Sequence, residues 1–266
     1  MDHSSAERTR TVLAVLHPRA FATGTSAALL HGLPIPGALA GRLELAVPAP
    51  MRAARRRGVV ARSLRIIEPE VVRLDDIRVT TLPRTWCELA RTLDVPQLVA
   101  SGDAAVRAVG IDQLTASARR HPDRRLHRKL ATALEMLDPG SESPKESELR
   151  AIVMLAGLPR PRANVTVRDG NGRFIARVDL MFDEYGEILE YQGDHHRTDL
   201  RQWRRDRTRE AELEALGHHV TEVTQADLRR PAELVGRIAA NLRRRGWPAQ
   251  QVDSPWMPRS QHERHA

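Results

Sequence analysis

The chain has 266 residues, enough for two modest domains, and 41% of them are hydrophobic, although aromatic residues make up only 3%. The formal net charge of +8 is carried mainly by arginine, which suits phosphate-bearing partners but also fits a coding bias toward arginine. The single cysteine excludes an intramolecular disulfide and fits a reducing cytoplasm. No apolar run reaches the roughly 20 residues that cross a bilayer, and the N-terminus lacks the pattern of a secretion signal.

Residues 1–110 are predicted to form a small mixed α/β domain. Apolar spacing, prolines and glycines predict helices at 6–16, 25–32, 82–90 and 95–109, and strands at 43–47, 59–64 and 77–80. No residues here have catalytic spacing. His31 is interpreted as a packed or surface histidine, and the arginines of 52–57 as either a solvated loop or a nucleic-acid contact.

Residues 111–145 are predicted to be a helical linker. Helices are expected at 111–120 and 124–137, and the second carries leucines at spacings of four, four and three. This leucine stripe is interpreted as packing against one domain, with a dimer seam as the alternative. The Pro-, Gly- and Ser-rich run 139–144 marks the domain boundary.

Residues 146–246 are predicted to form a second domain, and 247–266 a disordered tail. The expected order is a helix, a three-strand meander, a helix, a strand and a helix. Together with the first half, this order predicts an α/β protein of the α+β kind. Ser143 is a candidate N-cap of the first helix, and Glu146 follows at capping-box spacing.

The stretch 177–196, R-V-D-L-M-F-D-E-Y-G-E-I-L-E-Y-Q-G-D-H-H, is typical of two strands joined by an acidic turn. If the strands form a hairpin, Asp179 and Glu190 meet on one face near its open end. Two facing carboxylates repel unless a cation lies between them, and magnesium prefers oxygen ligands. The alternative is a charge pair on a surface hairpin.

The motifs E-S-E-L-R, R-V-D-L, L-E-Y-Q-G-D-H-H and W-R-R-D-R-T-R-E-A-E-L-E-A-L-G-H-H-V occur in this order. Together they resemble the restriction-endonuclease-like PD-(D/E)XK core, most closely its very-short-patch-repair (Vsr)-like branch. The resemblance implies that Asp179 and Glu190 are the two motif carboxylates and that Glu146 is the acid of the first helix. It implies an endonuclease in which these three acids hold Mg²⁺ or Mn²⁺ for hydrolysis of DNA phosphodiester bonds.

Other residues enter the candidate site with alternatives. Gln192 stands where the motif has lysine, and its amide carries no charge. His195 or His196 is a candidate general base or acid, with a solvated loop as the alternative. Glu146 is interpreted either as a metal ligand or as a simple helix cap.

The helix predicted at 200–216 supplies candidate nucleic-acid contacts. Arg201, Arg204 and Arg205 are positioned to bind phosphates, or to pair with glutamates along the helix. Trp203 either packs in the core or stacks on a base.

The first half carries a second resemblance. T-S-A-A-L-L-H-G-L-P-I-P, L-E-L-A-V-P and V-T-T-L-P-R-T-W-C-E-L-A, within residues 20–108, resemble the AbiEi-type antitoxin-like domain. This implies an accessory domain with a toxin or another protein as partner. Three hypotheses follow: a DNA endonuclease, a catalytically inactive DNA-binding regulator, and a protein-interaction partner without nucleic acid.

Overall fold

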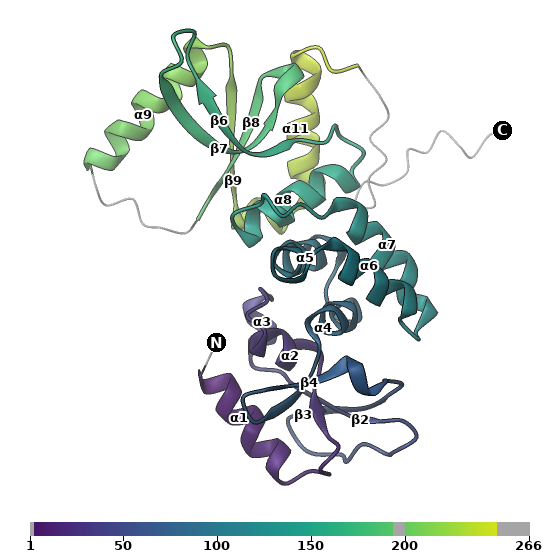
Figure 1. The fold of residues 1–266 in the computed structure, drawn as a ribbon. Coiled ribbons are helices and arrows are strands. Elements are labelled where there is room, and N and C mark those ends of the chain that lie inside the picture. Colours follow the sequence, from purple (N-terminus) through teal and green to yellow (C-terminus); the bar gives the residue numbers. More distant parts are fainter. Residues whose placement is uncertain (1–2, 194–199, 249–266) are drawn as a thin grey trace, which may run out of the picture. The chain divides into compact units, whose positions relative to one another are not determined.

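A computed structural model describes residues 3–193 and 200–248 of the protein, and the side chains of residues 6–193 and 207–248. The chain forms two compact units, Met1–Pro139 and Gly140–Ala266, and Figure 1 labels most of their helices and strands. Each unit contains helices and a mixed sheet, which confirms the α+β class. Within the described ranges, no helix combines the length and apolarity that a membrane span needs.

The first unit is built on a five-stranded sheet of order β3-β2-β1-β5-β4. The strands are β1 (Phe21–Ala22), β2 (Leu43–Pro48), β3 (Val59–Leu64), β4 (Val71–Leu74) and β5 (Ile77–Thr80). β1 is antiparallel to β2 and parallel to β5, so it lies in the middle of the sheet. Phe21 and Ala22 are fully buried. Two residues cannot show an alternating pattern, so sequence analysis missed β1, and it missed β4 as well.

Seven helices are described in the first unit: α1 (His3–Ala14), α2 (Gly24–Leu30), α3 (Gly37–Ala40), α4 (Leu82–Leu89), α5 (Val95–Val109), α6 (Ile111–Arg120) and α7 (His127–Met136). The helices of the predicted linker pack within this unit. Asp123, between α6 and α7, pairs with Arg91 at 2.7 Å, and the backbone N–H of Asp138 donates to Asp103 of α5 at 2.7 Å. Leu130 of the leucine stripe is fully buried. The segment up to residue 139 is therefore part of the first unit.

A buried ion-pair network joins α4 to its surroundings. The Arg84 guanidinium contacts Glu88 and Glu70, each at 2.8 Å, and Arg84 and Glu88 both have side chains only 2% exposed. His121 and Arg91 also donate to Glu88, at 3.1 and 2.9 Å. Burial alone would raise the pKa of Glu88, but the hydrogen bonds from His121 and Arg91 and the charge of Arg84 lower it to about 2.

This depressed pKa predicts acid sensitivity. Ionised Glu88 stabilises the fold above the unfolded pKa of 4.5, and this contribution, of the order of 3 kcal/mol, is lost as the pH falls to about 2. Urea denaturation measured between pH 7 and pH 2.5 should therefore show Glu88→Gln less stable than wild type at pH 7, with the difference shrinking below pH 4.5. A difference independent of pH would contradict this assignment.

Gly24 is required at the start of α2. Its φ is +52°, and a Cβ there would lie 2.2 Å from Oε2 of the buried Glu44. Gly24→Ala should therefore lower the free energy of unfolding by about 2–3 kcal/mol. Gly37→Ala is the control, because its Cβ would meet nothing within 4 Å and should change stability by less than about 0.5 kcal/mol. Equal stabilities of the two variants in urea denaturation would refute the steric argument.

The second unit contains a four-stranded sheet of order β6-β7-β8-β9. The strands are β6 (Arg162–Arg168), β7 (Phe174–Phe182), β8 (Glu187–Gln192) and β9 (His219–Thr224). The first three strands form an antiparallel meander, and β9 is parallel to β8. A parallel neighbour requires a crossover connection, which α9 (Leu200–Ala215) provides. The predicted order of elements is therefore observed, with the short helix α10 (Gln225–Leu228) added.

Helices cover both faces of this sheet (Figure 1). On one face, α8 (Pro144–Leu155) and α11 (Pro231–Arg244) pack on residues such as Leu180, Leu189 and Val223. On the other face, Leu213 of α9 packs in a cluster with Ile188. Trp247 belongs to the first of these cores and is only 5% exposed, although sequence analysis assigns it to the tail. The rest of that predicted tail, from residue 249, lies outside the described residues.

Candidate functional site: a carboxylate cluster at a strand fork

The β7–β8 hairpin opens into a fork. Its ladder ends at the pair Leu180–Leu189, and Asp179 comes next on β7. The Asp179 carboxylate Oδ2 accepts a hydrogen bond from the backbone N–H of Tyr191 at 2.7 Å, so a side chain takes the place of a ladder bond. Cross-strand partners face the same side, and the faces alternate along each strand. On β7, however, Val178 packs in the cluster with Ile188 and Leu180 in the cluster with Leu189, so the alternation breaks at Asp179, whose carboxylate lies at the open end of the ladder.

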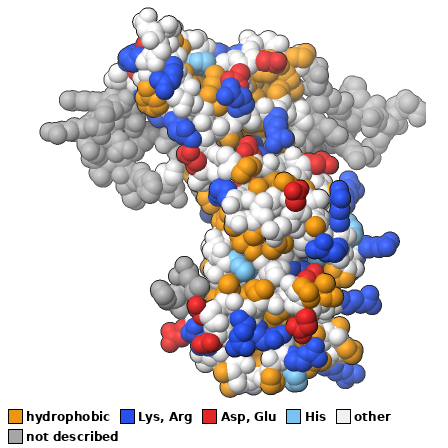
Figure 2. Space-filling model, viewed as in Figure 1, with side chains coloured by type: hydrophobic (Ala, Val, Ile, Leu, Met, Phe, Trp, Pro, Cys, Tyr) orange, Lys and Arg blue, Asp and Glu red, His pale blue; other side chains and the backbone are white. Residues whose placement is uncertain are grey.

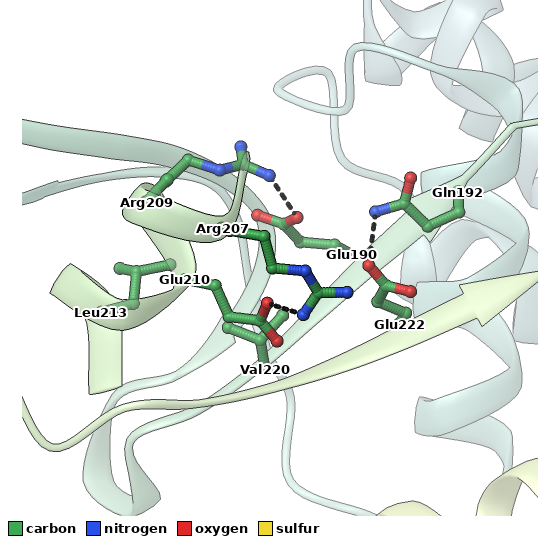
Figure 3. Close-up of a pocket in the computed structure, with 8 residues that line it drawn as sticks. All are labelled: Glu190, Gln192, Arg207, Arg209, Glu210, Leu213, Val220 and Glu222. Carbon is green, nitrogen blue, oxygen red and sulfur yellow. Dashed lines mark hydrogen bonds and ion pairs between the residues drawn. The ribbon is translucent and has the colours of Figure 1, made fainter. Parts of the chain in front are cut away.

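Glu190 is buried and already has a cationic neighbour. Its side chain is 9% exposed, and Nη2 of Arg209, from α9, lies 2.9 Å from Oε2 (Figure 3). The parallel register of β8 and β9 places Glu222 beside Glu190. Gln192 donates its amide N–H to Oε1 of Glu222 at 3.3 Å. The residue at the motif's lysine position thus contacts an acid of the neighbouring strand.

These side chains line a small pocket between α9 and the strands β8 and β9 (Figure 3). Its lining consists of Glu190, Gln192, Arg207, Arg209, Glu210, Leu213, Val220 and Glu222. Arg207 contacts Glu210 of its own helix at 2.6 Å, whereas Arg209 reaches across to the sheet. The two described arginines of this helix end are therefore engaged within the unit, one along the helix and one at the fork.

Glu146 joins the cluster from the start of α8. Its backbone N–H donates to Oγ of Ser143 at 3.2 Å, which confirms Ser143 as the N-cap. The Glu146 carboxylate Oε2 accepts from the backbone N–H of Glu142 at 3.0 Å and from the amide of Asn164 at 3.1 Å. Glu146 as a whole is only 8% exposed. Glu146 can therefore take part in both the helix cap and the cluster, because its backbone N–H contacts the cap residue while its carboxylate is held by Glu142 and Asn164.

Burial and several neighbouring charged groups act on the pKa of Asp179. Burial raises it, and the negative charges of Glu146 and Glu142 raise it further. The hydrogen bond from Tyr191 and the positive charge of Arg209 act in the opposite direction. Acids from α8 and β7 and a cation from α9 thus share one electrostatic environment at the fork.

Asn164 is a site residue that sequence analysis missed. The β6–β7 ladder skips it at the position opposite Asp179, and its φ of +53° is left-handed. Its amide donates to the carbonyl of Gly140 at 2.8 Å and to Glu146. Asparagine tolerates this conformation better than most residues, and such strain persists where the surroundings hold it. Asn164 thereby links the start of α8 to strand β6.

The structure places the predicted residues unequally. It describes Glu146, Asp179, Glu190 and Gln192 around the fork. His195 and His196 lie outside the described residues. The backbone of α9 is described at Arg201, Trp203, Arg204 and Arg205, but their side chains lie outside the described part of the chain.

A hard divalent cation is compatible with the donor chemistry of the fork. Asp179, Glu190 and Glu146 offer carboxylate oxygens, and one of these acids already holds a guanidinium. Among the described residues, however, no group of three or more His, Cys, Asp or Glu side chains is gathered in a metal-holding arrangement. The donor atoms of the acids therefore suit the ion, although the described acids are not gathered around one point.

Two curated proteins of Mycobacterium tuberculosis are similar to this chain: uncharacterized protein MT2308 of strain CDC 1551 and uncharacterized protein Rv2248 of strain H37Rv. Each is 32% identical to it over 177 residues, which is 63% of this chain and 63% of the relative's length. The match therefore spans less than two thirds of either relative. No protein-family model matches the chain, and no solved structure does so.

Proposed function

We propose that the second unit is a metal-dependent DNA endonuclease that hydrolyses phosphodiester bonds at the β7–β8 fork. The observation that carries this proposal is the fork itself. Asp179 replaces a ladder bond there, while the buried Glu190 and Glu146 contribute further negative charge. A sheet has no packing reason to direct several acids to one region, because buried carboxylates are costly without a counter-charge.

The residues at the fork would have different roles in this reaction. Asp179, Glu190 and Glu146 would hold Mg²⁺ or Mn²⁺, which supplies Lewis-acid charge stabilisation and lowers the pKa of a bound water. The Tyr191 N–H fixes the orientation of the Asp179 carboxylate. Arg209 lies beside Glu190 and carries the positive charge that Gln192 lacks, so it is placed to contact a phosphate of the substrate.

The charge distribution of the surface supports a local site better than a broad binding face. On the face shown in Figure 2, Lys and Arg side chains are interspersed with acidic and apolar ones. Over the whole chain there are 42 basic and 34 acidic residues. Binding to DNA should therefore be moderate, with a salt dependence set by the few phosphates that a local site contacts.

A plasmid-nicking assay tests the proposal. The full chain is incubated with supercoiled plasmid and either Mg²⁺ or Mn²⁺, with chelator in parallel reactions. We expect conversion to nicked or linear plasmid that stops when chelator is added. Cleavage that persists in chelator would reject a metal-dependent site at the fork.

The second candidate is a catalytically inactive DNA-binding regulator that uses the same fold as a binding module. The contact of Gln192 favours it, because the amide is engaged with Glu222 and supplies no charge to a reaction. Salt-sensitive DNA binding in a gel-shift assay, without cleavage under any metal condition, would support this candidate over the enzyme.

The first unit is proposed to be an accessory domain. Its resemblance to antitoxin-like domains supports this role and implies a toxin or another protein as partner. The Arg84–Glu88 ion pair in this unit is nearly inaccessible to solvent, with both side chains 2% exposed. We therefore assign that ion pair to stability and place the proposed chemistry in the second unit.

A further inference from the structure

Arg209 is anchored so that its guanidinium reaches the fork from a fixed base. Leu213 follows it by one helical turn on the same side of α9 and is only 1% exposed, packed in the core. The Arg209 side chain itself is 35% exposed, and its Nη2 lies 2.9 Å from Oε2 of Glu190. Its base is thus held by packing while the guanidinium lies at the edge of solvent.

The Arg209 guanidinium compensates the negative charge of Glu190, which would otherwise be buried without a counter-charge beside it. Glu190 is 9% exposed at its side chain, and an ionised carboxylate so buried is destabilising without a cation beside it. Arginine stays protonated at any physiological pH, so Arg209 can leave Glu190 only by moving. Its partial exposure and long apolar stem permit such a movement toward water.

A divalent cation on the same carboxylate would repel this guanidinium. Both charges are positive, and in a partly buried site water screens their repulsion less than it would in bulk solvent. We propose that Arg209 competes with the divalent cation for the carboxylate of Glu190 and is displaced to the pocket mouth when the cation binds. This inference rests on the proposed function, because it concerns the metal that the fork is proposed to hold.

The displacement has a functional consequence. A guanidinium released from Glu190 is a free bidentate donor beside the proposed reaction site, and phosphate is the group it would bind. Metal binding would therefore prepare the pocket for a nucleic-acid backbone. By linkage, a phosphate that holds Arg209 away from Glu190 would raise the affinity for the metal by the same factor by which the metal raises the affinity for phosphate.

Arg207 provides a matched control on the same helix. It is two residues from Arg209, lines the same pocket and contacts Glu210 of its own helix at 2.6 Å. Its removal deletes the same charge from the same pocket but breaks an ion pair along the helix, with Glu210, in place of the Arg209–Glu190 pair. A difference between variants at the two positions therefore isolates the contact with Glu190 from a general change in charge.

Titration of the full chain with Mn²⁺, followed by the electron paramagnetic resonance signal of the free ion, tests the inference. We expect Arg209→Gln to bind Mn²⁺ roughly three- to tenfold more tightly than wild type, the size expected for removing one partly exposed charge pair. Arg207→Gln should change the affinity by less than about twofold. In a Glu190→Gln background, binding should weaken and Arg209→Gln should give no gain.

The outcomes separate this inference from the proposed function. If wild type binds Mn²⁺ and Arg209→Gln binds equally or more weakly, the competition is refuted while the metal site survives. If neither binds Mn²⁺, both the competition and the metal site are refuted.

A second measurement uses the wild-type fold, in case Arg209→Gln does not fold. The Nε–Hε nuclear magnetic resonance signal of Arg209, assigned by its loss in Arg209→Lys, should shift on addition of Mg²⁺, while that of Arg207 should not. An Arg209 signal that does not move at a Mg²⁺ concentration that saturates the site would overturn the inference.

Discussion

Asp179→Asn is expected to lower the rate of metal-dependent plasmid cleavage by at least about a hundredfold. The amide keeps an oxygen that can accept from the Tyr191 N–H at the fork, so the fold should be preserved. It removes the negative charge that would bind the cation. The measurement is the initial rate of plasmid nicking by the full chain at saturating Mg²⁺.

Asp183→Asn is the matched control for this change. Asp183 lies in the turn of the same hairpin, is 42% exposed at its side chain and pairs with Arg162 at 3.0 Å. Its loss should leave the cleavage rate within about twofold of wild type, because a surface ion pair contributes little. Nicking by Asp179→Asn at the wild-type rate would remove the hydrolysis site from the fork.

Arg84→Met is expected to produce the largest loss of stability, about 3–5 kcal/mol. The variant keeps most of the volume of the side chain but leaves Glu88, at 2% exposure, with one fewer cation, and Glu70 loses its ion pair with Arg84. Breaking a buried pair from one side is costly because the remaining charge stays desolvated. Urea denaturation followed by circular dichroism at pH 7 gives the difference.

Arg125→Met tests whether that loss comes from burial. Arg125 also contacts an acid, Asp123, at 3.0 Å, but its side chain is 86% exposed. Its removal should cost less than about 1 kcal/mol, since exposed pairs contribute little. If Arg84→Met and Arg125→Met lower the free energy of unfolding equally, burial does not explain the contribution of the Arg84–Glu88 pair to stability.

Much of the second unit follows from local pattern. Alternation predicts which side chains of β8 share a face, and Gly186, at φ +56°, ends the acidic turn as turn chemistry requires. The Ser143 cap fixes the start of α8 and with it the position of Glu146. Asp179 and Glu190 stand out in the sequence as carboxylates on strands, whereas Glu146 joins them only through the family resemblance, and among the described residues the three acids form no metal-holding group.

The partners of these acids could not be predicted in the same way. Glu222 lies beside Glu190 only because β9 returns parallel to β8 after a helix, a pairing that no local period encodes. Arg209 is one of many arginines on α9, and only the tertiary packing of Leu213 selects it for the fork. Asn164 depends on a left-handed backbone, for which an asparagine is a weak signal.

The first unit shows the same limit at its boundary. The Pro- and Gly-rich run after residue 138 marks the chain's division well, and the units separate at Pro139 and Gly140. The helices before this run look like a linker in sequence, because an apolar helix face does not indicate which of the two units it packs against. The contacts of Asp123 with Arg91 and of Asp138 with Asp103 assign them to the first unit.

Anomalous X-ray diffraction from crystals of the full chain grown with Mn²⁺ tests the carboxylate site most directly. We expect a manganese peak within about 2.5 Å of carboxylate oxygens of both Asp179 and Glu190, with the Arg209 guanidinium moved away from Glu190. An absence of manganese at the fork, with Arg209 still bound to Glu190 at saturating Mn²⁺, would contradict both the proposed site and the proposed exchange.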